Sequence, residues 1–291
     1  MNRATVGSLI LLGVLLPAPP LFAHTALSVD NNALWRVDLD TLSGNVLVEL
    51  NGPSPFFWCH HLAVSSTGMI RCAIGGSLYS IDRASGEVIE LPPPLPIPPP
   101  PPGTNSGGLT FDAADRLWYI DQATSVLLHL DPGTGAVLSS RPLSLTGTFS
   151  VTLAALGDRL FVFTQDTGRG SRYLEEIDPT TGASLSATEF PQLAPPVDAA
   201  FDESGDLWVV EATGEIILGV FCYRVDRIAL ATSTVEEVSS TCLYYSEPFF
   251  YSIAGVRGTV LEIPTLDHVG QLFLLGLLLL SGLLVLRRSG P

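Results

Sequence analysis

The chain has 291 residues, with 29 acidic side chains against 14 basic ones and a net charge of −15 at neutral pH. A surface this acidic repels the phosphates of nucleic acids and anionic lipid head groups, so we expect no nucleic acid partner. Every basic residue is an arginine, and the lack of lysine excludes Schiff-base chemistry.

Residues 1–23 have the pattern of a secretory signal peptide. Arg3 precedes an apolar run from Leu9 to Leu16, prolines follow, and Ala23 is a small residue in front of a polar segment. We therefore expect cleavage after Ala23 and export of the rest of the chain.

Residues 24–262 repeat a short strand that ends in an aspartate. The aspartates are spaced by 44, 49, 47 and 48 residues: Asp38, Asp82, Asp131, Asp178 and Asp226. Four of them are followed by a turn that contains a glycine: Gly44, Gly86, Gly135 and Gly182. In such turns the aspartate bonds back to the backbone and the glycine takes a positive φ. The repetition indicates that the aspartates shape turns rather than bind a metal.

A second apolar segment lies between successive turns: Leu62–Val64, Leu109–Phe111, Leu153–Ala155, Ala199–Phe201 and Ile253–Gly255. Each unit then holds four short strands in about 47 residues, which is the period of a β-propeller. We expect an all-β propeller of five four-stranded blades. The turn at Asp38 lacks an inner strand before it and Ser252–Val256 lacks a turn after it, so the two chain ends should share one blade and close the ring.

Residues 91–103 interrupt the repeat with a proline-rich run. Such a run adopts the extended polyproline II conformation. We expect a stiff spacer between the second and third units, with a ligand for an aromatic groove as the alternative.

The residue pattern of the repeat, as in Gly108–Asp112 followed by Leu117–Asp121, resembles that of the NHL, SMP-30 and streptogramin-lyase-like propellers. The resemblance covers most of the body and implies the fold. It does not by itself imply a function.

Polar residues mark the loops that enter the expected inner strands, which gather at one mouth of a propeller's channel: His60, His61, Asn105, Asp198 and Glu247. Such a mixture can bind a divalent cation, as in lactonases of the SMP-30 type, which these positions resemble in kind. The alternative is a histidine pair that is stacked or capped in a loop. No nucleophile elbow, zinc-protease motif or phosphate-binding loop is present, so no catalytic residue is assigned.

The chain has four cysteines: Cys59, Cys72, Cys222 and Cys242. An even number in an exported chain indicates disulfides. Sequence alone allows three pairings, and we expect the local pairs Cys59–Cys72 and Cys222–Cys242 because each lies within one repeat unit.

The C-terminal residues 263–291 combine a short motif, an apolar run and two arginines. The run 269–286 would span about 27 Å as a helix, close to the hydrocarbon thickness of a bilayer. Arg287 and Arg288 would stay on the cytoplasmic side and stop transfer. We expect one transmembrane helix; a buried C-terminal helix is the alternative.

The order of Ile263, Pro264, Thr265, Leu266, apolar helix and terminal arginines resembles the IPTL-CTERM sorting signal of Gram-negative bacteria. The resemblance covers this tail and implies processing by an exosortase-type enzyme at the inner membrane. An ordinary tail anchor is the rival interpretation.

Two functions from different classes fit this sequence. The first, which we favour, is an exported, envelope-sorted propeller that acts as a non-catalytic surface or binding scaffold for an unknown ligand. The second is a metal-dependent hydrolase or lyase that uses the channel mouth.

Overall fold

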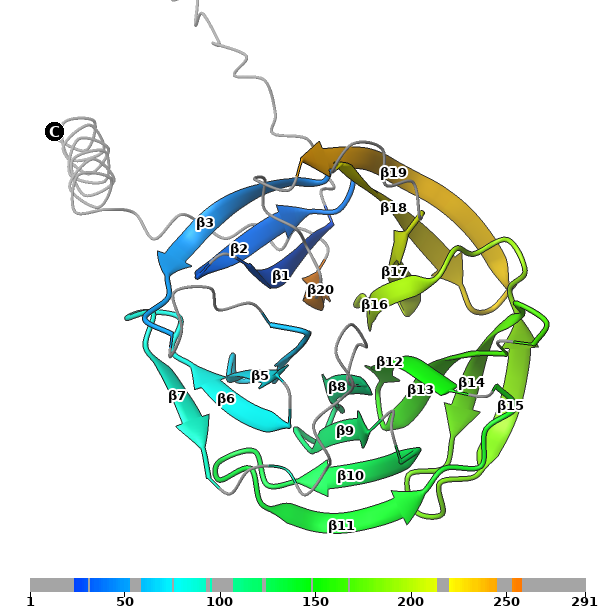
Figure 1. The fold of residues 1–291 in the computed structure, drawn as a ribbon, viewed down its shortest axis with the longest axis horizontal. Helices are drawn as coiled ribbons and strands as arrows, with labels where there is room; N and C mark the ends of the chain where they lie inside the picture. Colours follow the sequence, from blue (N-terminus) through cyan, green and yellow to red (C-terminus); the bar gives the residue numbers. More distant parts are fainter. Residues whose placement is uncertain are drawn as a thin grey trace, which may run out of the picture.

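The chain forms a ring of five antiparallel sheets around a central axis (Figure 1). The computed structural model describes residues 24–30, 32–52, 59–74, 76–92, 95, 107–121, 124–147, 149–166, 168–213, 220–244 and 253–257. Within these ranges, twenty strands form five sheets of four strands each. The expected five-bladed propeller is therefore confirmed.

Each blade takes its strands in chain order from the axis outward, apart from the first. Blade 1 holds β20 (Ala254–Arg257), β1 (Thr25–Asp30), β2 (Ala33–Asp38) and β3 (Ser43–Glu49). Blade 2 holds β4 (His61–Val64), β5 (Ile70–Ile74), β6 (Ser77–Ile81) and β7 (Val88–Leu91). Blade 3 holds β8 (Gly107–Phe111), β9 (Leu117–Asp121), β10 (Val126–Leu130) and β11 (Val137–Pro142).

Blades 4 and 5 follow the same order. Blade 4 holds β12 (Phe149–Leu156), β13 (Arg159–Gln165), β14 (Arg172–Ile177) and β15 (Ser184–Glu189). Blade 5 holds β16 (Pro196–Phe201), β17 (Asp206–Ala212), β18 (Val220–Ala229) and β19 (Thr234–Tyr244).

The ring closes through a strand from the far end of the chain. β20 pairs antiparallel with β1, with Leu27 opposite Ala254 and Thr25 opposite Arg257. The first and last segments therefore share blade 1, as the incomplete units at the two chain ends predict. This closure leaves no blade with a missing inner strand.

Each gap between neighbouring blades has its own apolar core. In β9, Leu117 and Tyr119 pack toward blade 2, whereas Trp118 and Ile120 pack toward blade 4. Successive side chains of a strand point to opposite faces, and both faces of each blade are covered by neighbours. This is why the second strand of a blade reads as a continuous apolar run, as in parallel sheets buried on both sides.

The repeated turns join each blade to the one before it. Gly86 and Gly182 have φ of 74° and 78°, and an added Cβ would lie 2.0 Å from the carbonyl oxygen of Glu49 and 2.2 Å from that of Pro142. Both carbonyls end the outer strand of the preceding blade. Glycine is needed here both for its backbone conformation and for the close approach.

The fifth aspartate of the repeat is not a turn residue. Asp226 lies inside β18, where it pairs with Val209 and Glu237, and the turn begins only after Ala229. We expected Asp226 to shape a turn as the other four aspartates do. This was wrong, because β18 continues for three residues beyond Asp226. In blade 1 the positive φ likewise falls on Leu42 and not on Gly44.

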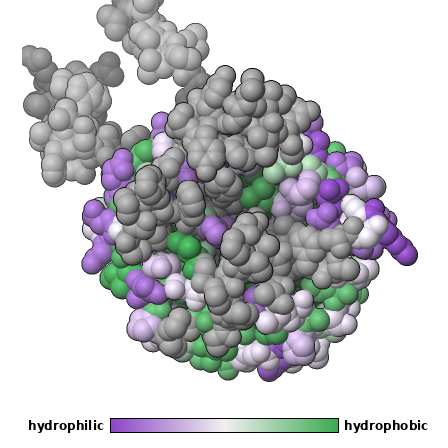
Figure 2. All heavy atoms as spheres, viewed as in Figure 1, coloured by the Kyte–Doolittle hydropathy of each residue, from purple (hydrophilic) through white to green (hydrophobic). Residues whose placement is uncertain are grey.

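Among the described residues, the large apolar side chains that are exposed lie on outer strands. Val46, Ile89, Leu138 and Leu185 are 42%, 50%, 57% and 61% exposed and come from four different blades. Figure 2 shows hydrophilic residues along much of the rim with hydrophobic ones between them. Single exposed apolar residues of this kind are normal for a protein surface.

Several expectations fall on residues outside the described ranges: the signal peptide 1–23, most of the proline-rich run, and the whole tail 263–291. Leu95 of the proline-rich run is described, and it is buried in the core between blades 2 and 3. Among the described residues, no helix has the length and apolar character of a membrane span.

Candidate functional site

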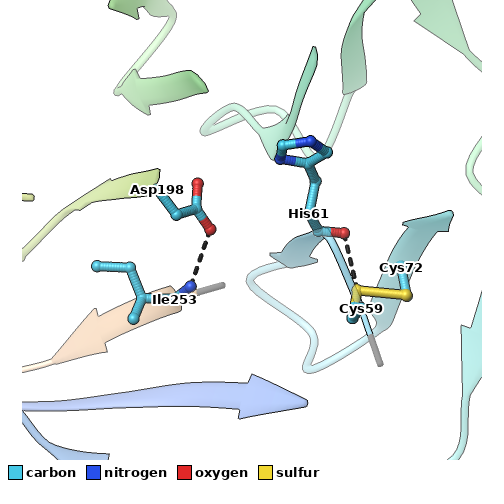
Figure 3. The surroundings of a disulfide bond; sticks show 5 residues. All are labelled: Cys59, His61, Cys72, Asp198 and Ile253. Carbon is cyan, nitrogen blue, oxygen red and sulfur yellow. Dashed lines mark hydrogen bonds between the residues drawn. A yellow bond between two sulfur atoms is a disulfide. The ribbon is translucent and has the colours of Figure 1, made fainter. Parts of the chain in front are cut away.

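The inner strands bring two of the predicted site residues to the same end of the ring. His61 is the first residue of β4 and Asp198 is the third of β16, and in the ring these two strands flank β20. Figure 3 shows both side chains projecting from their strands into the space around the axis. His60 directly precedes His61, while Asn105 and Glu247 lie outside the described residues.

Asp198 is held by three hydrogen bonds from three inner strands or their ends. Its Oδ1 accepts from the Thr152 hydroxyl at 2.6 Å and from the Ala199 amide at 2.9 Å, and its Oδ2 accepts from the Ile253 amide at 2.8 Å. The residue is only 4% exposed. Burial raises the pKa of Asp198 to about 7, although the three donors act in the opposite direction. The carboxyl thus clamps blades 4 and 5 to the strand that closes the ring.

His61 is buried without hydrogen bonds on its ring. It is 1% exposed, and neither Nδ1 nor Nε2 has a partner among the described residues. Burial, with a smaller contribution from His60, lowers the pKa of His61 to about 3, so the imidazole is neutral near pH 7. A neutral imidazole carries one donor and one acceptor, and both remain available here.

The histidine pair is not stacked. The ring centroids of His60 and His61 are 6.5 Å apart at an interplanar angle of 89°, and burial also lowers the pKa of His60. The disulfide Cys59–Cys72 anchors this segment, because Cys59 Sγ contacts the carbonyl oxygen of His61 at 3.0 Å (Figure 3). The disulfide therefore helps to hold the backbone of both histidines in place.

A cavity lined by uncharged residues runs along the inner strands. It is lined by residues of all five strands and of the segment before β20, among them Leu62, Leu109, Phe201 and Ile253, and has a volume of about 450 Å³ including space open to solvent. Leu62, which follows His61, and Ala199, which follows Asp198, are among the lining residues, whereas His61 and Asp198 themselves are not. No lining residue carries a charge.

A metal site is not assembled by the described residues. They contain no group of three or more histidine, cysteine, aspartate or glutamate side chains that could hold a metal ion. The Asp198 carboxyl accepts three hydrogen bonds from the protein rather than presenting its oxygens to a cation. A divalent cation at this mouth would thus depend on Asn105 and Glu247, which lie outside the described ranges.

A second buried polar cluster, in blade 5, was not predicted. Glu211 and Asp226 are 0% and 1% exposed and share one guanidinium: Arg224 Nη2 lies 2.6 Å from Glu211 Oε2 and 3.0 Å from Asp226 Oδ2. Burial, together with the charge of Asp226, raises the pKa of Glu211 to about 7. Burial also raises the pKa of Asp226. Glu211 and Arg224 are direct cross-strand partners, a relation that requires the register of two strands separated by a loop.

The two expected disulfides are present. Cys59–Cys72 lies in blade 2, and Cys222–Cys242 joins β18 to β19 in blade 5. Both pairings are the local ones, so each bond stays within one blade.

No protein-family model and no curated protein matches the chain. Solved structures do match. A chain from a nidogen–laminin complex superposes with a TM-score of 0.50 at 15% identity, over 79% of this chain and 97% of that one. A protein of unknown function from Bacteroides caccae gives 0.46 at 15% identity, covering 77% and 73%. A streptogramin B lyase gives 0.41 at 20% identity, covering 76% and 70%. At 15% identity, the match to the chain from the nidogen–laminin complex shows a likeness of fold alone.

Proposed function

We propose that this chain is an exported β-propeller that serves as a non-catalytic binding scaffold at the envelope of a Gram-negative bacterium. The ligand binds at the channel end where His61 lies. The observation that carries the proposal is the buried imidazole of His61, whose two ring nitrogens have no partner among the described residues. Buried polar atoms are nearly always hydrogen-bonded, so this ring favours an external partner.

The surroundings of His61 favour an uncharged ligand. The imidazole is neutral, and the neighbouring cavity is lined by Leu62, Phe201 and other uncharged residues. Transferring a full charge into such a space is costly without a counter-charge. An uncharged ligand with hydroxyl or amide groups can pair with both the donor and the acceptor of the ring.

Export and sorting rest on other features. Disulfides persist in oxidising compartments, and two are present. The signal-peptide pattern of residues 1–23 supports transfer across the inner membrane. The tail motif supports anchoring by the helix 269–286 and processing by an exosortase-type enzyme.

The alternative is a metal-dependent hydrolase or lyase of the SMP-30 or streptogramin-lyase type, with His60, His61, Asn105, Asp198 and Glu247 around a divalent cation. The pKa of about 7 at Asp198 favours it, because a general base works best near the operating pH. The three hydrogen bonds to that carboxyl favour the scaffold instead.

A thermal-shift experiment separates the two functions. The probes are neutral oligosaccharides, tested with EDTA and, separately, with Ca²⁺ or Zn²⁺. A ligand at 100 times its Kd stabilises the folded state by about 2.7 kcal/mol. We expect a probe to raise the Tm of the wild type in EDTA and to leave His61→Leu unchanged. A shift that appears only with added metal, and that is lost in Asp198→Asn, would establish the alternative.

A further inference from the structure

The two disulfides lie in opposite environments. Cys59 and Cys72 are both 0% exposed, in the core between blades 1 and 2. Cys242 is exposed on the outer strand β19, and Cys222 opposite it is half-buried. Thiol–disulfide exchange requires in-line access of a thiolate to a sulfur, so only the second bond is open to attack.

The exposed bond ties together the open end of a long hairpin. Cys222 pairs directly with Cys242, while the neighbouring strand β17 already ends at Ala212, opposite Tyr223. At Cys222 the third strand is represented only by Thr213, whose amide and hydroxyl donate to the Cys222 carbonyl at 3.0 and 3.1 Å. Only two residue pairs of β18 and β19 lie beyond the disulfide, at the start of β18 and the end of β19: Phe221 with Leu243 and Val220 with Tyr244.

This end of the hairpin holds the segment that leads to Asp198. Arg224, two residues from Cys222, donates from Nη2 to the Gln192 carbonyl at 3.2 Å. Its partner Glu211 accepts from the Ala194 amide at 3.0 Å, and Ala212 N donates to the Pro195 carbonyl at 3.1 Å. β16 starts at the next residue and carries Asp198 to the channel. A continuous set of contacts thus connects the exposed disulfide with the inner strand.

We propose that Cys222–Cys242 is an exchangeable disulfide, opened by the dithiol of an envelope oxidoreductase, and that its opening loosens the segment 192–198 at the channel. Cys59–Cys72 stays closed and keeps the histidine pair in place. This proposal does not depend on which ligand the channel binds.

The exchange balances in two steps. A thiolate of the dithiol attacks the exposed Sγ of Cys242, which forms a mixed disulfide and releases Cys222 as a thiolate that takes up a proton. The second thiol of the partner then attacks the partner's own sulfur in the mixed disulfide and releases Cys242. The protein disulfide is reduced to two thiols by two electrons and two protons, and the dithiol is oxidised to a disulfide.

The test uses the full exported protein in its oxidised form. It is incubated with graded dithiothreitol, quenched with an alkylating agent and digested for mass spectrometry. We expect Cys222 and Cys242 to be labelled at least about tenfold faster than Cys59 and Cys72, whose access requires opening of the core. Equal rates, or faster labelling of Cys59 and Cys72, overturn the proposal.

Amide hydrogen exchange then tests the connection to the channel. After selective reduction, residues 192–198 should exchange faster, while β11 on the other side of the ring should not change. The variant Cys222→Ser with Cys242→Ser should show the same pattern without reductant. Faster exchange confined to β18 and β19 overturns the proposal.

A further variant tests the connection without touching the cysteines. Arg224→Met in the oxidised protein removes the bond to Gln192, and with it the positive charge between Glu211 and Asp226, while keeping an extended apolar side chain. It should speed exchange in 192–198 by itself. Arg227→Met, in the same strand but paired with Glu236 at the surface, is the matched control and should leave that segment unchanged; an equal response of both variants contradicts the proposed route.

Discussion

Asp198 and His61 show how position on an inner strand decides the role of a polar residue. Asp198 has three protein donors and His61 has none on its ring among the described residues. The sequence places both at one channel mouth and assigns both to a ligand. In the structure the two residues differ in their hydrogen bonding. The Thr152 hydroxyl of the neighbouring blade and the Ile253 amide beside the closing strand donate to Asp198 and not to His61.

We predict that Asp198→Ala destabilises the protein by about 3 kcal/mol, because three buried donors lose their acceptor and each unsatisfied group costs about 1–3 kcal/mol. Asp198→Asn keeps one side-chain oxygen as acceptor and should cost less than half as much. Urea unfolding followed by tryptophan fluorescence measures both. Equal losses in the two variants would show that the hydrogen bonds are not what Asp198 contributes.

The pH dependence of stability should report the blade 5 cluster. The pKa of Glu211 is raised from 4.5 to about 7 in the folded state, so the folded protein holds a proton that the unfolded chain releases. The groups facing it are Arg224, Asp226 and Glu237. Stability from this group is fully present below pH 4.5 and falls by about 1.4 kcal/mol per pH unit as the pH rises toward 7.

The glutamine in Glu211→Gln is neutral at every pH. The slope of the unfolding free energy against pH should therefore fall by the amount that corresponds to about one bound proton. Asp198, whose pKa is also raised to about 7, and Asp226, whose pKa burial raises, should maintain the remainder. Glu176→Gln is the control, since the hydrogen bond from Arg159 lowers the pKa of Glu176 and its effect falls at acid pH. Chemical denaturation at several pH values between 5 and 8 decides; an unchanged slope in Glu211→Gln would show that Glu211 is ionised throughout.

At the scale of the elements, the sequence predicts what local chemistry determines. The turns at Asp82, Asp131 and Asp178 form as expected, with the carboxylate accepting from backbone amides two residues ahead and the glycine amide donating back. The polar turns before β9 and β17 are likewise alike: Asp112 and Asp202 each accept from a tryptophan indole at 2.8 Å. Asp226 was misassigned because the length of β18 depends on pairing with β17 and β19, which no local pattern contains.

The glycines of these turns offer a matched comparison. In Gly182→Ala the new Cβ would lie 2.2 Å from the Pro142 carbonyl oxygen, whereas Gly170, with a similar φ of 71°, has nothing within 4 Å. We predict that Gly170→Ala costs about 1 kcal/mol for the backbone conformation alone. Gly182→Ala should cost about 2 kcal/mol more, from the clash. Thermal or urea unfolding measures the difference, and equal costs would contradict the inter-blade contact.

At the scale of the molecule, repetition made most of the fold predictable. Four complete units, an incomplete unit at each end that together make the fifth blade, and cysteine pairs within units predict the ring, its closure and both disulfides. The cluster of Glu211, Arg224 and Asp226 was not predictable, because residues 214–219 separate the two strands and their length does not set the register. The channel residues were predictable as a group through topology, but the distinction between Asp198 and His61 needs atomic contacts.

The tail 263–291 can be an ordinary anchor or a sorting signal, and the two make different demands on its sequence. A plain anchor needs only the apolar run 269–286 and the terminal arginines, so changes in the short motif before it should have no effect. A processing enzyme must instead find an accessible, proline-stiffened backbone just outside the bilayer. We predict that the mature protein lacks the residues from about Leu266 onward. Pro264→Ala with Thr265→Ala should preserve membrane insertion and block that loss.

Mass spectrometry of the C-terminal peptide from envelope fractions measures the outcome. Thr259→Ala, a change of the same residue type outside the motif, is the matched control and should be processed normally. A wild-type protein that retains Arg287 and Arg288 in cells with an active exosortase-type enzyme would make the tail an ordinary anchor. The ring would then stay tethered at the inner membrane, and its channel would meet only ligands that reach that surface.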